Sequence, residues 1–305
     1  MFTTTLTRRA TLGAGLLFLA GCSRERPLRV GSKNPTEQAI LGEVLAQHLE
    51  RRLGQTVERR PELGGTVMAH QALMTGQVDL YPEYTGTALT SVLKLPPESR
   101  AEVVLERVRS EYRSRFRLQW LEPLGFSSDV AMVVRGADAR EHALETLSDA
   151  ARLSSGWVLG VDQEFLTRTD GLPALMKVYE IRLTAAPRTL TPNLLYQALQ
   201  KKQVSMAAVN STDGLLVARD LKVLRDDKGA FSPCQAAVVV RSEALEAHRG
   251  LREALTALSG KLSQETMRKL NYEVDGNHRR PADVAREFLK KPGTDGTFPG
   301  SGPRR

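Results

Sequence analysis

The stretch Leu28-Arg29-Val30-Gly31-Ser32-Lys33-Asn34-Pro35-Thr36-Glu37 decides the fold, because it joins a short apolar strand directly to the start of a helix. Asn34 can cap that helix, Pro35 suits its first position, and Glu37 would complete a capping box. Polar and charged side chains therefore gather at a helix N-terminus beside a strand end. In open α/β sheets such places bind anionic groups, since free N–H groups and the helix dipole both point there.

A second strand end follows along the chain. Gly64-Gly65-Thr66 opens another predicted helix, and residues 77–81 are predicted to form a strand that leads into the loop Pro82-Glu83-Tyr84-Thr85-Gly86-Thr87. Helix and strand patterns alternate along most of the chain, so we expect an α/β fold with mainly parallel sheets. Residues 28–87 would form one half of a ligand cleft.

Two internal repeats predict a second half of similar build. Gln71-Ala72-Leu73 with Gln77-Val78 recurs as Gln197-Ala198-Leu199 with Gln203-Val204 at the same spacing, which puts Tyr84 in register with Asn210. Short repeats also arise by chance.

The apolar strands Val130–Arg135 and Ala236–Arg241 also resemble each other, and both end in arginine. They are either two ordinary buried strands or the connections of a hinged pair of lobes.

Several longer motifs follow one another in a familiar order: 31–38, 63–66, 79–87, 164–173, 211–214 and 224–229. Together they resemble the substrate-binding proteins of osmoprotectant (glycine betaine, choline and carnitine) ABC importers over residues 28–289. The resemblance implies a two-lobed periplasmic-binding-protein fold of type II, with two mainly parallel sheets and helices, joined by a two-strand hinge. Lobe 1 would contain residues 23–130 and 236–290, and lobe 2 residues 131–235.

The resemblance also implies ligand-binding residues. Family members that bind betaines hold the carboxylate with polar and basic side chains, and by motif Lys33, Thr87 and Arg168 occupy these positions. Arginine suits this role because its planar fork can meet both carboxylate oxygens.

The family surrounds the quaternary ammonium with aromatic rings, whose faces attract cations. Tyr84 matches one such position, but Val130, Asn210 and Cys234 stand where three further aromatic residues are expected. Three lost rings at roughly 0.5–1.5 kcal/mol each would weaken betaine binding by roughly 1.5–4.5 kcal/mol, on the order of ten- to a thousandfold. The sequence therefore predicts weak binding of glycine betaine.

A carboxylate-bearing solute such as an amino acid or another small zwitterion would suit the altered positions. Asn210 and Gln235 offer hydrogen-bond donors and acceptors, and Asp129 offers an anion for an ammonium group. The alternative is that Tyr81 or Phe231 rebuilds the aromatic cage from a displaced position.

Both chain ends lie outside the resemblance. Arg8-Arg9 precede an apolar run over residues 10–20, too short to span a bilayer, which ends in Leu19-Ala20-Gly21-Cys22. This pattern predicts a lipoprotein signal peptide over residues 1–22 with lipidation of Cys22, exported by the Sec or the twin-arginine route. Residues 291–305 are rich in glycine and proline and are predicted to be a disordered tail.

Composition excludes several other functions. The formal charge of +8 is spread among interleaved acidic residues, with no basic block for nucleic acid. With Cys22 used as the anchor, Cys234 has no cysteine partner, and the five histidines lack metal-ligand spacing, so we expect no metal and no cofactor. Asp129 and Asp213 are acid–base candidates by position alone, and Asp213 is expected to fix its own loop, so we predict no enzyme.

These observations predict a monomeric lipoprotein on the outer side of the cytoplasmic membrane, in the periplasm or at the cell surface. It would capture a small carboxylate-bearing solute and deliver it to an ABC permease. The alternative is a sensor lipoprotein that presents its closed form to a membrane receptor.

Overall fold

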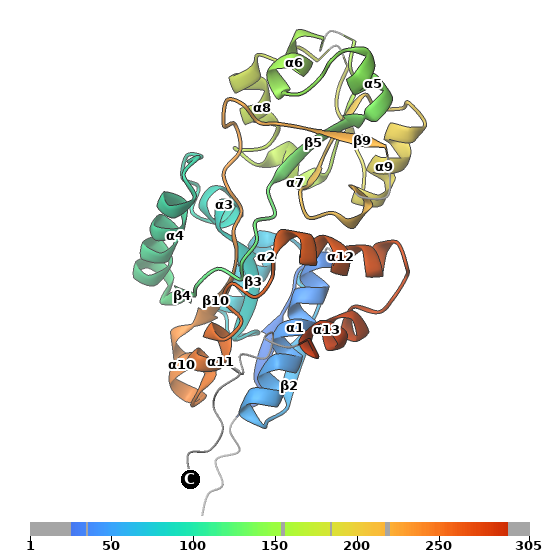
Figure 1. Ribbon diagram of the computed structural model, residues 1–305. Helices are drawn as coiled ribbons and strands as arrows, with labels where there is room; N and C mark the ends of the chain where they lie inside the picture. The colour runs from blue at the N-terminus through green and yellow to red at the C-terminus, as the bar shows by residue number, and fades with distance from the viewer. Residues whose placement is uncertain (1–25, 35, 154–155, 184, 217–219, 292–305) are drawn as a thin grey trace, which may run out of the picture.

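The computed structural model describes residues 26–34, 36–153, 156–183, 185–216 and 220–291. Its strands form two five-stranded sheets, which lie in separate bodies joined by two chain segments (Figure 1). We call the body that holds both ends of the described chain lobe 1, and the other lobe 2. The predicted α/β class and two-lobed fold are confirmed. Both sheets are mixed rather than mainly parallel, since each has two parallel and two antiparallel pairings.

The sheet of lobe 1 lies between two helix layers. Its strand order is β2 (Val57–Arg60), β1 (Leu28–Gly31), β3 (Leu80–Tyr84), β10 (Ala236–Arg241) and β4 (Leu118–Trp120). One face is covered by α1 (Thr36–Leu53), α10 (Ser242–Ala247), α11 (Leu251–Thr256), α12 (Gln264–Asp275) and α13 (Pro281–Leu289). The other is covered by α2 (Thr66–Met74), η1 (Ala88–Val92) and α4 (Ala101–Phe116). The short helix α3 (Thr85–Thr87) follows β3 directly.

Lobe 2 repeats this arrangement. Its strand order is β7 (Arg188–Thr189), β6 (Leu159–Val161), β8 (Met206–Asn210), β5 (Val130–Arg135) and β9 (Leu221–Leu224). One face packs against α5 (Gly136–Glu141), α6 (Leu147–Arg152), α7 (Gln163–Thr167) and α8 (Leu172–Tyr179). The other packs against α9 (Pro192–Gln200) and η2 (Gly214–Leu216).

The two continuously apolar strands are buried on both faces. In β10, Ala236, Val238 and Val240 join one core cluster, while Ala237 and Val239 join the other. β5 alternates in the same way between the two clusters of lobe 2. Side chains of a strand point alternately to opposite faces, so a strand inside two helix layers needs apolar residues throughout.

The first internal repeat is a structural repeat as well. The carbonyl of Ala72 accepts the N–H groups of Gln77 and Val78 at 2.8 and 3.3 Å, where α2 turns back toward β3. The carbonyl of Ala198 accepts those of Gln203 and Val204 at the same 2.8 and 3.3 Å, between α9 and β8. Tyr84 and Asn210 accordingly end equivalent strands.

The two segments that cross between the lobes pair with each other. Ser127 and Gln235 form an antiparallel bridge, and Ser128 N–H donates to the carbonyl of Cys234 at 2.9 Å. Val130, assigned to lobe 1 from the sequence, is the first residue of β5 and pairs with Asn210 in the sheet of lobe 2.

A further interlobe contact comes from α12, which lies directly below lobe 2 in Figure 1. The Arg268 Nε–H donates to the carbonyl of Ser211 at 2.7 Å, and the Asn271 amide to that of Thr212 at 2.9 Å.

Two local predictions are wrong. The capping box does not form, because Asn34 Oδ1 accepts the N–H of Gly64 at 2.7 Å and the Glu37 carboxylate binds partners distant in sequence. β3 begins at Leu80 rather than at residue 77, since the N–H groups of Gln77 and Val78 bond back to α2.

None of the helices in the described ranges is both long and apolar enough to cross a membrane.

Candidate functional site

A cavity of about 320 Å³ lies between the lobes, at the strand ends. Of the predicted site residues, those that line it are Lys33, Tyr84 and Thr87 from lobe 1 and Val130, Arg168 and Asn210 from lobe 2. Cys234 is not among its lining residues. Cys22 and the predicted tail from residue 292 onward lie outside the described residues.

Lys33 is buried at the lobe 1 wall. Its ammonium donates to Glu83 Oε1 at 2.6 Å and to Thr66 Oγ1 at 3.2 Å, and it lies 5.0 Å from the centre of the Tyr84 ring. Glu83 is fully buried and also accepts the Tyr81 hydroxyl at 3.1 Å. An ammonium has three N–H donors, so one remains for a ligand.

Arg168 is held at the opposite wall by a buried carboxylate. Its Nε and Nη2 donate to the two oxygens of Asp170 at 2.8 and 2.7 Å, and Asp170 is fully buried. Its Nη1 donates to Thr87 Oγ1 at 3.1 Å, across the lobe boundary. Burial is the largest single effect and lowers the pKa of Arg168, but the hydrogen bonds to Asp170 and the charges around the guanidinium together outweigh it and raise that pKa. The second Nη1 hydrogen remains for a ligand.

Tyr84 places its ring at the cavity and its hydroxyl on a carboxylate. The hydroxyl donates to Glu37, which also accepts the Asn271 amide at 2.8 Å. Burial, followed by the nearby charge of Glu37, raises the pKa of Tyr84 well above its usual value, so the phenol stays protonated. The neighbouring Gln38 amide opposes this rise in pKa, although neither of its polar atoms meets the geometry of a hydrogen bond.

A second polar contact crosses the cavity near Lys33. The Thr66 hydroxyl donates to Glu164 Oε1 at 3.0 Å, and Glu164 lies on α7 of lobe 2. Thr66 therefore links Lys33 of lobe 1 to a carboxylate of lobe 2. Together with the Arg168–Thr87 bond, it connects the predicted carboxylate-binding residues to the contacts that hold the lobes together.

Cys234 lies behind the cavity wall rather than on it. Its thiol is 2% exposed, 3.9 Å from Thr87 Oγ1 and 4.0 Å from Arg168 Nη2. Burial raises the pKa of the thiol, so it is a neutral packing group. Asp129 is occupied in the crossing segments, where its Oδ1 accepts the N–H of Cys234 at 2.8 Å. Neither Asp129 nor Gln235 lines the cavity.

The rings at the cavity are Tyr84 and Phe165, as far as the described residues show. Tyr81 is fully buried with its hydroxyl on Glu83, and Phe231 packs against Phe165 with ring centres 6.0 Å apart. Neither Tyr81 nor Phe231 lines the cavity. Sequence reasoning missed Phe165, although it lies within one of the family motifs.

Asp213 forms the predicted turn, since its Oδ1 accepts the N–H of Leu215 at 2.9 Å. No group of His, Cys, Asp and Glu side chains suited to a metal ion occurs within the described part of the chain.

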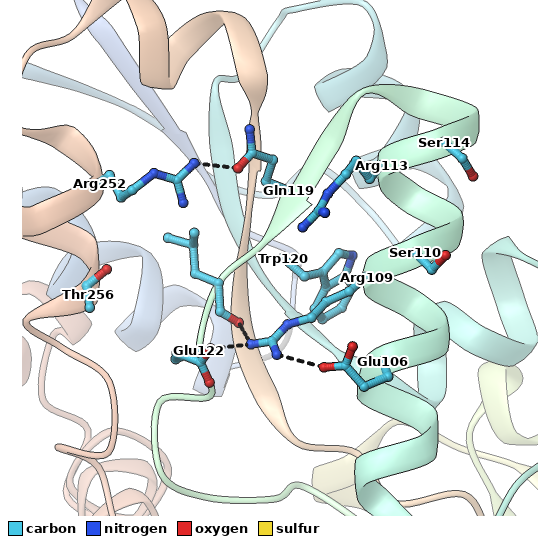
Figure 2. Close-up of a pocket in the computed structure, with 11 residues that line it drawn as sticks. Glu106, Arg109, Ser110, Arg113, Ser114, Gln119, Trp120, Glu122, Arg252 and Thr256 are labelled. Carbon is cyan, nitrogen blue, oxygen red and sulfur yellow. Dashed lines mark hydrogen bonds and ion pairs between the residues drawn. The ribbon is translucent and has the colours of Figure 1, made fainter.

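A larger pocket of about 710 Å³ lies within lobe 1, between α4, β4 and α11 (Figure 2). Part of its charge is already paired, since Arg109 contacts Glu106 at 3.0 Å and Glu122 at 2.7 Å, and Arg252 donates to the neutral amide of Gln119. It contains none of the predicted ligand-binding residues.

Residues 26–291 match the family described as the substrate binding domain of ABC-type glycine betaine transport systems. The chain belongs to this family. It is 35% identical to the carnitine transport binding protein OpuCC of Listeria monocytogenes, over 90% of this chain and 92% of that protein. It is also 35% identical to the ergothioneine transport permease/ergothioneine binding protein EgtU of Helicobacter pylori, covering 88% of this chain but only 48% of that protein.

Among solved structures, a glycine betaine/carnitine/choline ABC transporter protein shares the fold, with a TM-score of 0.76 and 32% identity. The match covers 88% of this chain and 99% of that one.

Proposed function

We propose that this protein is the extracytoplasmic, lipid-anchored substrate-binding component of an ABC importer, and that it captures a small carboxylate-bearing solute between its lobes. The observation that carries this proposal is the pair Lys33 and Arg168, which reach one cavity from opposite lobes, each with an N–H to spare. A carboxylate bridging them would make contacts available only when the lobes are together. Such differential contacts shift an open–closed equilibrium, and no covalent chemistry is needed.

The other end of the solute would meet a partly aromatic wall. Tyr84 and Phe165 offer rings, whereas Val130 and Asn210 occupy two expected aromatic positions. Because Cys234 lies behind the wall, two of the expected rings are missing rather than three. Their absence would weaken the binding free energy of a betaine by roughly 1–3 kcal/mol. We infer that quaternary ammonium solutes such as those named for the relatives bind more weakly here than amino-acid-like zwitterions.

The test is calorimetric titration of the purified protein with glycine betaine, carnitine, ergothioneine and the common amino acids. Each bound acid is then compared with its own amide, which leaves the protein unchanged. We expect the amide to bind at least tenfold more weakly, since hydrogen bonds to charged groups contribute about 1.5–3 kcal/mol. Equal affinity for acid and amide would refute the carboxylate site.

The anchor and the permease are tested separately. Cys22 should carry diacylglycerol, detectable by mass spectrometry of the membrane fraction, and Cys22→Ser should release the protein. One relative is named both permease and binding protein, which supports a permease partner. Deleting the gene should abolish uptake of the identified solute; intact uptake with a lost signalling response would favour the sensor alternative instead.

A further inference from the structure

A smaller pocket of about 200 Å³ adjoins the interlobe cavity and is strongly acidic. The two share wall residues that include Glu37, Asn210 and Asp213, so they are neighbouring spaces. Asp275 of α12 adds a third carboxylate. No Lys, Arg or His is among the described residues that line this pocket.

These carboxylates have hydrogen-bond donors but no cationic partner. Glu37 accepts from Tyr84 and Asn271, Asp213 from Leu215, and Asp275 from the Thr36 hydroxyl at 2.7 Å. None of the three forms an ion pair with another described residue, which distinguishes them from Glu83 and Asp170 beside the cavity.

Burial raises the pKa of Asp213 against the opposing hydrogen bonds from Leu215 and Tyr196, and the charges of Asp275 and Glu37 raise it further. Burial likewise raises the pKa of Asp275, against smaller opposing effects of Thr36 and His278. Unpaired, partly buried carboxylates are costly, so a cation placed among them would be bound favourably.

Two buried amides beside these carboxylates each have an oxygen without a hydrogen-bond donor. Asn271 is 3% exposed and lines the pocket, yet its Oδ1 has no partner among the described residues. Its orientation is fixed, because its Nδ2 donates to Glu37 and to the carbonyl of Thr212, and a flipped amide would set oxygen against oxygen. Gln38, 1% exposed at the adjoining cavity wall, also keeps an unpartnered Oε1. Such oxygens need N–H or O–H donors.

We propose that the acidic side pocket binds an N–H-bearing cation of the solute, an ammonium or a guanidinium, while the interlobe cavity holds its carboxylate. This proposal rests on the proposed function and specifies its substrate class as a solute like a basic amino acid. A quaternary ammonium has no N–H and could not donate a hydrogen bond to these carboxylates. A volume of about 200 Å³ accommodates a guanidinium with part of its alkyl chain.

The sharpest test compares L-arginine with L-citrulline, which share length, carboxylate and α-amino group and differ in side-chain charge. Calorimetry on the purified protein should give at least tenfold tighter binding of arginine. L-Lysine shows whether an ammonium serves as well as a guanidinium; preference for either over citrulline supports the proposal.

Asp213→Asn and Asp275→Asn should each weaken arginine binding tenfold or more and leave citrulline within twofold. Asparagine keeps the Oδ1 acceptors for Leu215 and Thr36, so the local structure is retained, as circular dichroism would verify. Glu265→Gln, exposed on the same α12 and paired with Lys269, is the matched control and should change neither affinity.

Equal binding of arginine and citrulline, binding of neither, or an unchanged preference in both aspartate variants would overturn the proposal. Glycine betaine and carnitine are titrated in parallel. If they bind and basic amino acids do not, the side-pocket proposal fails while the proposed function stands. If no carboxylate solute binds, both fail.

Discussion

Replacing Arg168 by alanine should destabilise the empty protein before any solute is added. The guanidinium supplies two of the hydrogen bonds to the fully buried Asp170, whose further donor is the Thr90 hydroxyl at 3.0 Å. Arg168→Ala would leave this carboxylate buried without its cationic partner. Removing one partner of a buried ion pair costs about 3–5 kcal/mol, so we expect the free energy of unfolding to fall by that amount.

A double-mutant cycle separates the stranded charge from lost packing. Asp170→Asn keeps an acceptor for Thr90 but removes the charge, so Arg168→Ala combined with Asp170→Asn should be more stable than Arg168→Ala alone by about 1–3 kcal/mol. Urea unfolding is followed by the fluorescence of Trp120 in lobe 1 and Trp157 in lobe 2, which report each lobe.

The matched control is Arg152→Ala, whose partner Asp149 is paired at the surface of α6; it should change stability by less than about 1 kcal/mol. The reasoning is refuted if Arg168→Ala stays within about 1 kcal/mol of wild type, or if Asp170→Asn fails to restore stability. A loss of solute binding in Arg168→Ala would not by itself prove a ligand contact. The comparison of acid and amide solutes is the cleaner test.

Three further predictions concern the residues around the cavity. Tyr84→Phe removes a donor from the buried Glu37 and should lower the free energy of unfolding by about 1–3 kcal/mol in urea titrations; an unchanged midpoint would contradict this. Thr66→Val removes the hydrogen bond to Glu164 across the cleft, worth about 1.5–3 kcal/mol, so spin-label distances between the lobes should shift toward open states; identical distance distributions would count against it. Burial raises the pKa of Asp275, so its contribution to stability declines as pH rises from the unfolded value of about 3.9 through the raised folded value. The melting temperature of Asp275→Asn should therefore be higher than that of wild type at pH 7 and equal to it near pH 3. A lower melting temperature of the variant at pH 7 would show that the charge of Asp275 does not destabilise the fold.

The repeat between the lobes could be predicted because it is a local pattern. The turns after α2 and α9 depend on a few neighbouring residues and on one carbonyl each, that of Ala72 and that of Ala198. Similar local sequences therefore form the same turn. Strand direction is not local. A strand buried on both faces is apolar whichever way it runs, so the sequence of β10 could not reveal that it pairs antiparallel with β3.

The site was predictable where a family motif names a side chain, and less so where tertiary contacts decide its role. Lys33 and Arg168 were placed by motif, but their buried partners Glu83 and Asp170 become evident only in the fold. For Cys234 the motif predicted the position but not the contact. The residue lies next to the cavity, yet Thr87 and Arg168 lie against its short side chain. No sequence signal indicated that Asp275, from the other end of the chain, would join Glu37 at one pocket.

The charge balance around the cavity connects solute choice with closure. The two cations at its walls are already neutralised by Glu83 and Asp170, so they bind a carboxylate through remaining N–H groups rather than through excess positive charge. Carboxylates without a described ion pair also lie here: Asp162 and Glu164 at the cavity, and those of the side pocket. Two of the latter face the side pocket from different lobes, Glu37 from lobe 1 and Asp213 from lobe 2. In the empty protein, bringing the lobes together moves like charges toward each other, which opposes closure. A cation between them reverses the sign of that contribution. A solute with both a carboxylate and an N–H-bearing cation would therefore favour closure at two places, whereas a carboxylate alone would leave the repulsion in place.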